Sequence, residues 1–144
     1  MRNAEENNQA ENKQVVRDFI QTVWAGGDLG ALARYWTEDC INHALPAPDN
    51  QGLGALQAYH EQFLAAFAAF SDRGIHIVQQ VAEGDRVVTH LHTTGQHSEP
   101  FMGMPATGRH VSLATIRIDR MQNGKIAEHW SVADMAGLMQ QLGA

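Results

Sequence analysis

The spacing of the large apolar residues changes once along this chain, and that change limits the possible folds more than any other feature. Between Glu11 and Phe70 these residues recur every three or four positions, which predicts amphipathic helices. Between Gly74 and Val132 apolar and polar residues alternate, which predicts strands. Helices followed by antiparallel strands are typical of the α+β class. We therefore predict N-terminal helices packed on a curved, mostly antiparallel sheet that encloses a pocket.

Turn and capping residues divide the chain into predicted elements. Residues 1–10 are polar and are interpreted as a tail in front of a single domain at 11–144. A helix from Glu11 should end at Gly26 and Gly27, and Asp28 can cap a second helix that continues to Trp36. Prolines predict loops at 37–52 and 98–108. The other predicted elements are a helix at 53–70, strands at 74–83, 86–97, 109–121 and 125–132, and a C-terminal helix from Asp134.

Composition excludes several classes of protein. The length of 144 residues suits one domain, and a hydrophobic fraction of 44% is typical of a folded globular chain. A net charge of −6 with only 10 basic residues argues against nucleic-acid binding. The single cysteine, Cys40, allows neither an intrachain disulfide nor a cysteine-based zinc site. Neither a signal-peptide h-region nor a membrane-length apolar run is visible, so we expect a cytoplasmic protein without a membrane partner.

Four short stretches resemble a known family. They are Asn42-His43, FMGMPATGR at 101–109, NGKIAEHW at 123–130 and AGLMQQLG at 136–143. With them the chain resembles the SnoaL-like polyketide cyclases over roughly residues 11–143. That family shares a cone-shaped α+β barrel with ketosteroid isomerase and nuclear transport factor. The resemblance implies this barrel, and it implies an intramolecular aldol condensation that needs neither metal nor cofactor.

The sequence departs from the family at the residue expected to transfer protons. The family's acidic side chain on the last strand falls on Ser131 in an ungapped comparison. A serine hydroxyl cannot exchange a proton reversibly near neutral pH, as a carboxylate with a raised pKa can. His129 shares a strand face with Ser131, the resemblance puts that face inside the cone, and imidazole titrates near neutral pH. His129 is therefore the first candidate for proton transfer. Asp134 is the second, although it also fits a helix N-cap.

Other residues are expected to contact a substrate. The resemblance places the end of the first helix and the middle of the third against the pocket, hence Trp24 and Tyr59. It also puts a polar ligand contact near Arg117, which could hold a carboxylate or enolate oxygen or form a salt bridge at the mouth. Asn42 either orients a carbonyl or stabilises its turn. The predicted substrate-binding residues are Trp24, Asn42, His43, Tyr59, Phe63, Met104, Thr115, Arg117 and Ser131.

We therefore expect a cofactor-free enzyme that enolises a small, largely apolar carbonyl compound, leading to cyclisation, isomerisation or a related reaction. One alternative is a small-molecule binding protein without turnover. Another is a metal-dependent enzyme that uses the pair His90 and His92 with a third ligand from His43, His110 or His129. No carboxylate stands at ligand spacing beside that pair, so we predict no metal.

The last predicted strand is apolar on the face opposite His129 as well. Ile126, Trp130 and Val132 lie on that face if the alternation is regular. A strand with two apolar faces needs both covered. We therefore expect a homodimer or homotetramer that buries the outer faces of strands 111–118 and 125–132.

Overall fold

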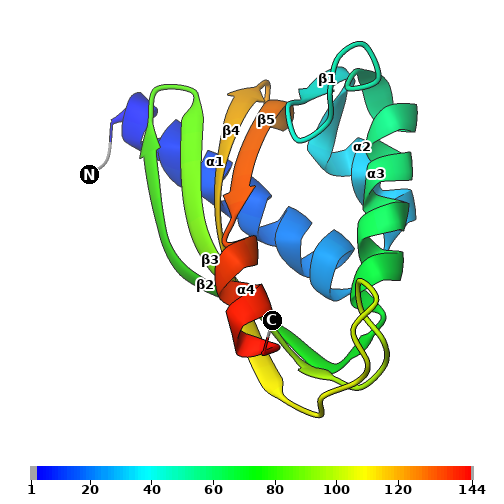
Figure 1. The fold of residues 1–144 in the computed structure, drawn as a ribbon. Helices are drawn as coiled ribbons and strands as arrows, with labels where there is room; N and C mark the ends of the chain where they lie inside the picture. The colour runs from blue at the N-terminus through cyan, green and yellow to red at the C-terminus, as the bar shows by residue number, and fades with distance from the viewer. Residues whose placement is uncertain (1–2, 144) are drawn as a thin grey trace.

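The computed structural model describes residues 3–143, which form helices packed on one five-stranded sheet. Figure 1 shows β2 to β5 on one side of the molecule and α3 on the other, with β1 beside the upper end of α3 and α1 running diagonally behind the strands towards the lower end of α3. The helical segments are α1 (Ala4–Phe19), the π-helical turn η1 (Ile20–Ala25), the 3-10 turn η2 (Leu29–Ala31), α2 (Leu32–Tyr35), α3 (Gly52–Phe67) and α4 (Met135–Gln141). The strands are β1 (Trp36–Asn42), β2 (Phe70–Glu83), β3 (Arg86–His97), β4 (His110–Gln122) and β5 (Lys125–Ala133).

The sheet has the order β1-β5-β4-β3-β2 and is mostly antiparallel. The three hairpin pairings follow the chain, whereas β1 joins the edge parallel to β5. This arrangement confirms the predicted α+β class with N-terminal helices on a mostly antiparallel sheet. Within residues 3–143, no helix combines the length and the apolar character that crossing a bilayer requires.

The first helix starts earlier than predicted, at Ala4 instead of Glu11. The Asn3 side chain accepts a hydrogen bond from the Glu6 backbone N–H, and the Glu6 side chain accepts one from the Asn3 N–H. This capping box satisfies two N–H groups that a helix start leaves free. Residues 4–8 are exposed, so an apolar period could not reveal this turn of the helix.

Strand β1 was not predicted, because its residues were assigned to a helix end and a loop. It is an edge strand, and its register against β5 shifts between Trp36 and Ile41. The exposed pair Glu38 and Asp39 interrupts the alternation that identifies a strand. Pairing with β5 is what makes this segment extended. The boundaries of the third helix and first predicted strand also move, since α3 ends at Phe67 and β2 begins at Phe70.

A bulge in β5 corrects the predicted position of Ile126. Met121 pairs with Ile126 and Arg120 pairs with Glu128, so Ala127 is an extra residue on β5. The bulge breaks the alternation, and Ile126 is fully buried in the core instead of lying on the outer face. From Glu128 onwards the alternation resumes, with His129 buried and Val132 exposed.

Two clusters of buried side chains make up the core. The larger joins α1 and η1 to the concave face of the sheet, through residues such as Val16, Phe19, Trp36 and Leu56. The smaller lies under α4, around Phe70, Phe101, Leu113 and Leu138. The volume between these clusters contains the site described next.

A π-helical turn connects α1 to that volume. Gly26 N–H donates to the Gln21 carbonyl at 2.9 Å, one residue further back than in an α-helix. A Cβ atom at Gly26 would lie 2.6 Å from the Thr22 carbonyl oxygen, so this close approach requires glycine. The widened turn carries Ile20, Trp24 and Ala25 to the cavity wall.

Candidate active site

A cavity of about 140 Å³ lies between η1, α3 and the concave face of the sheet. Its walls are mainly apolar, and the helices and β3 supply Ile20, Trp24, Tyr59, Phe63, Phe67 and Leu91. Polar side chains come from the sheet, namely Arg73, Thr93, Thr115, Arg117, His129 and Ser131. An apolar cavity with a few polar groups from one wall is typical of a small-molecule site.

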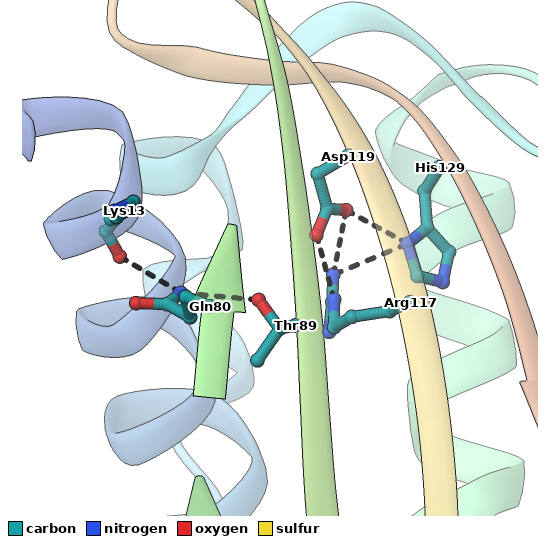
Figure 2. A network of polar contacts seen from close by, with 6 residues as sticks. All are labelled: Lys13, Gln80, Thr89, Arg117, Asp119 and His129. Carbon is teal, nitrogen blue, oxygen red and sulfur yellow. Dashed lines mark hydrogen bonds and ion pairs between the residues drawn. The ribbon is translucent and has the colours of Figure 1, made fainter. Parts of the chain in front are cut away.

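Three charged or titratable side chains meet on that wall (Figure 2). Arg117 and Asp119 are two residues apart on β4, so they share a face, and His129 on β5 is the direct neighbour of Asp119. Arg117 donates from Nε to Asp119 Oδ2 at 2.8 Å and from Nη2 to Oδ1 at 2.9 Å. His129 Nδ1 lies 2.8 Å from the same Oδ1. Asp119 is completely buried, and the other two are nearly so.

The hydrogen bonds fix the tautomer of His129. Nδ1 of His129 lies 2.8 Å from Asp119 Oδ1 and 3.3 Å from Arg117 Nη2, which can only donate. The ionised Asp119 can only accept, and it is the nearer partner, so Nδ1 carries the hydrogen and donates it to Asp119. The lone pair is therefore on Nε2, which has no hydrogen-bond partner within residues 3–143. This atom is also not one of the fully buried polar atoms that lack a partner there. Since His129 lines the cavity, Nε2 is free to meet a ligand.

The environment holds Asp119 charged and His129 neutral. Burial raises the pKa of Asp119, but the Arg117 charge and the His129 N–H outweigh burial and bring this pKa down to about 2. Burial lowers the pKa of His129 below 6.5, the Arg117 charge lowers it further, and Asp119 opposes both. At neutral pH, His129 is therefore an uncharged imidazole that can accept a proton.

Aromatic rings enclose the charged groups. The Arg117 guanidinium lies 5.0 Å from the centre of the Phe19 ring, and the Trp36 ring meets the His129 ring edge-on at 5.7 Å. These rings exclude water, which strengthens the hydrogen bonds to Asp119. A second polar chain fastens α1 over the same face: Gln80 Nε2 donates to the Lys13 carbonyl at 3.2 Å and to Thr89 Oγ1 at 3.1 Å (Figure 2).

His60 on α3 is a further buried histidine that the sequence did not single out. Its Nδ1 donates to the Leu56 carbonyl at 2.8 Å, and its ring lies 4.7 Å from the Trp24 ring and 5.7 Å from the Phe19 ring. Burial lowers the pKa of His60 to about 4, so it is neutral at pH 7. Its spacing from Leu56, Phe63 and Phe67 was the available signal, because all four share a helix face.

Asp119 was also missed, although it anchors the arrangement. The sequence pattern had singled out Arg117 and Thr115 as one strand face, and Asp119 continues that face by one step. A carboxylate two residues from an inward-facing arginine on a strand was therefore a usable signal. The structure brings seven of the predicted residues to the cavity wall, namely Trp24, Tyr59, Phe63, Thr115, Arg117, His129 and Ser131.

Asn42 and His43 do not line the cavity. The Asn42 Oδ1 accepts from Ala44 N–H at 3.0 Å, which stabilises the turn after β1. His43 lies on the outer side of the sheet, where its ring stacks on Trp130 at 4.9 Å and its Nε2 meets Glu128 at 2.7 Å. The backbone of His43 still supports the site, since His43 N–H donates to the carbonyl of His129 at 2.8 Å.

Asp134 and Met104 also lie outside the cavity wall. The Asp134 carboxylate accepts from Gly137 N–H at 2.8 Å and caps α4, which confirms the predicted N-cap. Met104 packs on the apolar cluster beneath α4, paired with Phe101 through the loop. Met104 is not among the residues that line the cavity.

His90 and His92 lie side by side on β3 and bond to neighbours on adjacent strands. His92 Nδ1 meets Ser112 Oγ at 2.9 Å, and His90 Nδ1 meets Gln79 Nε2 at 3.3 Å. In residues 3–143 no group of three His, Cys, Asp or Glu side chains is arranged to hold a metal. A site without metal remains a prediction.

The sequence and the fold resemble those of known proteins. The model of the SnoaL-like polyketide cyclases matches residues 14–142, and the chain belongs to this family. Aklanonic acid methyl ester cyclase DnrD from Streptomyces peucetius is 35% identical over 88 residues, which cover 58% of this chain. The match spans 61% of the length of DnrD.

Solved structures share the fold over nearly the whole chain. TsrD from Streptomyces laurentii superposes with a TM-score of 0.76 at 26% identity, covering 94% of this chain and 97% of its own. Wild-type IdmH from Streptomyces antibioticus gives a TM-score of 0.76 at 28% identity, covering 92% of this chain and 99% of its own.

Proposed function

We propose that this protein is a cofactor-free enzyme that enolises a small, largely apolar carbonyl compound, with His129 as the general base. The observation that carries the proposal is the hydrogen bond of 2.8 Å between His129 Nδ1 and Asp119, which leaves Nε2 free at the cavity wall. A histidine whose Nδ1–H is held by a buried carboxylate is oriented to take a proton at Nε2. Asp119 acts as a positioning residue that also stabilises the imidazolium once it forms.

In the proposed reaction, His129 Nε2 removes a proton from the carbon beside the substrate carbonyl. The electron pair of that C–H bond moves into the carbonyl and forms an enolate. In a cyclisation, the enolate carbon attacks a second carbonyl of the same molecule, and the resulting alkoxide takes the proton back from His129. In an isomerisation, the proton returns to a different carbon. Either path conserves all atoms and needs no oxidant or reductant.

Arg117 is suited to stabilise the enolate oxygen. Its Nε and Nη2 are occupied by Asp119, whereas Nη1 has no hydrogen-bond partner within residues 3–143. A fixed donor in a water-poor site lowers the energy of a charge that develops during reaction. The pairing with Asp119 holds the guanidinium in place, and Ser131, directly across from Arg117, offers a hydroxyl.

The comparisons support this chemistry and leave the substrate open. The family is that of the polyketide cyclases, and DnrD is by name a cyclase of a methyl ester. This chain would run such chemistry with a histidine in place of the carboxylate expected at position 131. The cavity volume of about 140 Å³ suits a body of about one ring, with any remainder extending out of the mouth.

Hydrogen exchange tests the proposed base directly. Acetophenone in D₂O loses its methyl proton signal as enolisation proceeds, which proton NMR follows over time. We expect the wild-type protein to accelerate this exchange, and His129→Gln to lower the accelerated rate by about a hundredfold or more, as for other general bases. The matched control is His90→Gln, the same substitution on another strand and away from the cavity wall, which should exchange at the wild-type rate.

The outcomes separate the candidate functions. Wild-type exchange that His129→Gln leaves unchanged contradicts His129 as the base. Saturable binding of the ketone with exchange only at the buffer rate indicates instead a binding protein without turnover. That second function draws its support from Ser131, which puts a hydroxyl where the family resemblance gives an acid.

A further inference from the structure

Arg73 lies at the edge of the cavity and belongs, with Asp72, to an irregular stretch of β2. The register of β2 against β3 shifts between Ser71 and Gly74, and Asp72 in this stretch has a positive φ of 52°. Bulges redirect side chains and are common next to binding sites. Here Arg73 is exposed and still lines the cavity, which places it where the cavity opens to solvent.

Gly95 on β3 lies beside the Arg73 side chain and allows Phe70 of β2 to approach closely. A Cβ atom at Gly95 would lie 2.9 Å from the Phe70 Cβ and 3.5 Å from the Arg73 Cγ. The first contact is shorter than carbon atoms tolerate, so a larger residue would push β2 away from β3 at this point. The stem of Arg73 therefore passes over a glycine, beside Phe67 and Thr93 of the cavity wall.

The charges around the cavity leave Arg73 without a counter-charge. Arg117, the other cavity cation, is neutralised by its two hydrogen bonds to Asp119. No ion pair within residues 3–143 includes Arg73, and no Asp or Glu lines the cavity. The chain as a whole carries a net charge of −6. The uncompensated positive charge of Arg73 at the cavity entrance is therefore opposite in sign to the net charge of the chain.

We propose that Arg73 binds an anionic group of the substrate, so that the preferred substrate is a carboxylate-bearing carbonyl compound and not its neutral ester. The apolar body would fill the cavity, its carbonyl would point towards His129 and Arg117, and its carboxylate would meet Arg73 at the mouth. This orientation rests on the proposed function, because it assigns the inner end of the cavity to the reacting carbonyl. The guanidinium can hold a carboxylate through two parallel hydrogen bonds.

A matched pair of small probes tests the charge preference without requiring turnover. 4-Acetylbenzoate and methyl 4-acetylbenzoate share a ring and a ketone and differ in one charge. Titration of ¹⁵N-labelled protein in H₂O, followed by amide chemical shifts, gives each Kd and the location of each probe. We expect the acid to bind about fivefold more tightly than the ester at low salt, with shifts at Gly74 and Gly95, and we expect salt to reduce the preference.

Variants assign the preference to Arg73. Arg73→Gln should bind the acid and the ester equally, and Arg73→Lys should retain part of the preference because the charge remains. Arg86→Gln is the control, since Arg86 is an exposed arginine of β3 that pairs with Asp85 away from the cavity. It should keep the wild-type preference.

Any one of four results would overturn the proposal. They are equal affinities of the wild-type protein for the two probes, a preference for the acid that survives in Arg73→Gln, chemical-shift changes away from the cavity, and no saturable binding of either probe. His129→Gln separates it from the proposed function. If that variant keeps the acid preference while ketone exchange does not depend on His129, then the anion site stands and the assigned base is wrong. If exchange depends on His129 and both probes bind equally, then the base stands and the anion site is wrong.

Discussion

The two histidines buried around the cavity differ in the partner of Nδ1, and that difference separates their roles. His129 donates to the Asp119 carboxylate, which compensates an imidazolium, whereas His60 donates to the neutral carbonyl of Leu56. Burial lowers the pKa of both rings, and it does so to about 4 in His60, where no carboxylate opposes it. His129 can therefore accept a proton during a reaction, while His60 is a neutral core residue packed on Phe19 and Trp24.

Replacement of Asp119, the carboxylate partner of His129, should impair His129 as a base. In Asp119→Asn the group that opposes the low pKa of His129 is lost, and an amide no longer specifies the Nδ1–H tautomer. We expect the hydrogen-exchange rate of acetophenone to fall by about a hundredfold or more, with little change in the affinity for the ketone. A profile of the exchange rate against pH measures this effect. Asp134→Asn is the control and should match the wild type. A profile for Asp119→Asn that overlays the wild-type profile would contradict the role of Asp119.

His60 should make the protein sensitive to mild acid. The unfolded chain protonates this residue below about pH 6.5 and the folded protein only near pH 4, so the stability present above 6.5 is lost as the pH falls towards 4. Between pH 7 and pH 5 this linkage should remove about 2 kcal/mol from the free energy of unfolding. Urea unfolding at both pH values measures it. In His60→Gln the decrease in the free energy of unfolding between pH 7 and pH 5 should be smaller by that amount, whereas His90→Gln should behave as the wild type. Equal decreases in both variants would refute His60 as the cause of the acid sensitivity.

Among the elements, the β4–β5 hairpin carries most of the site and α4 follows it directly. Arg117 and Asp119 come from β4, and His129 and Ser131 come from β5. The bulge at Ala127 determines which residues of β5 face inwards, and β1 holds the far side of β5 through the bond from His43 N–H to the His129 carbonyl. Asp134 ends this arrangement as the cap of α4.

The capping role of Asp134 predicts a change in stability without a change in chemistry. Asp134→Ala removes the acceptor for Gly137 N–H and should lower the free energy of unfolding by about 1 kcal/mol. Asp134→Asn retains a good cap and should cost much less. Urea unfolding and ketone exchange, measured together, check both statements. A hundredfold loss of exchange in Asp134→Asn would instead restore Asp134 as a proton-transfer group.

For the whole molecule, the outer face of the sheet remains apolar in a single chain. Ile116 pairs with Val132 across β4 and β5, and their exposed fractions are 44% and 77%. Ile118 pairs with Trp130 beside them, so the apolar residues form one continuous patch. Such a patch on a folded surface is typical of a contact between proteins. A homodimer or homotetramer that buries this patch therefore remains our prediction.

The introduction of negative charge on this face should dissociate the assembly. We expect wild-type protein to have a mass that is a multiple of 15.8 kDa in size-exclusion chromatography with light scattering. The double variant Ile116→Glu/Val132→Glu should be monomeric, because burying two carboxylates without partners is costly. Met102→Glu, an equally drastic change at an exposed loop residue, should leave the mass unchanged. A clean wild-type monomer at micromolar concentration would contradict the predicted interface.

The sequence by itself determined the class of fold and much of the cavity wall. The helical spacing of Trp24, Tyr59 and Phe63 and the strand alternation through His129 are local consequences of backbone geometry, which repeats every few residues and can be read directly. The family resemblance then indicated which of these faces meets the pocket. The cap at Asp134 is equally local, since it joins residues three apart. Those features needed no knowledge of which segments pair.

Only the tertiary structure decided which inward-facing groups meet. The β4–β5 register makes Asp119 and His129 neighbours, and a bulge of one residue moves Ile126 into the core. The parallel pairing with β5 makes β1 a strand despite its weak alternation, and it turns His43 to the outer side of the sheet. Register and bulges depend on contacts between distant segments, and a shift of one residue exchanges the two faces of a strand. The tautomer of His129 and the charge of Asp119 follow from that register, so the chemistry of the site became visible only in the folded chain.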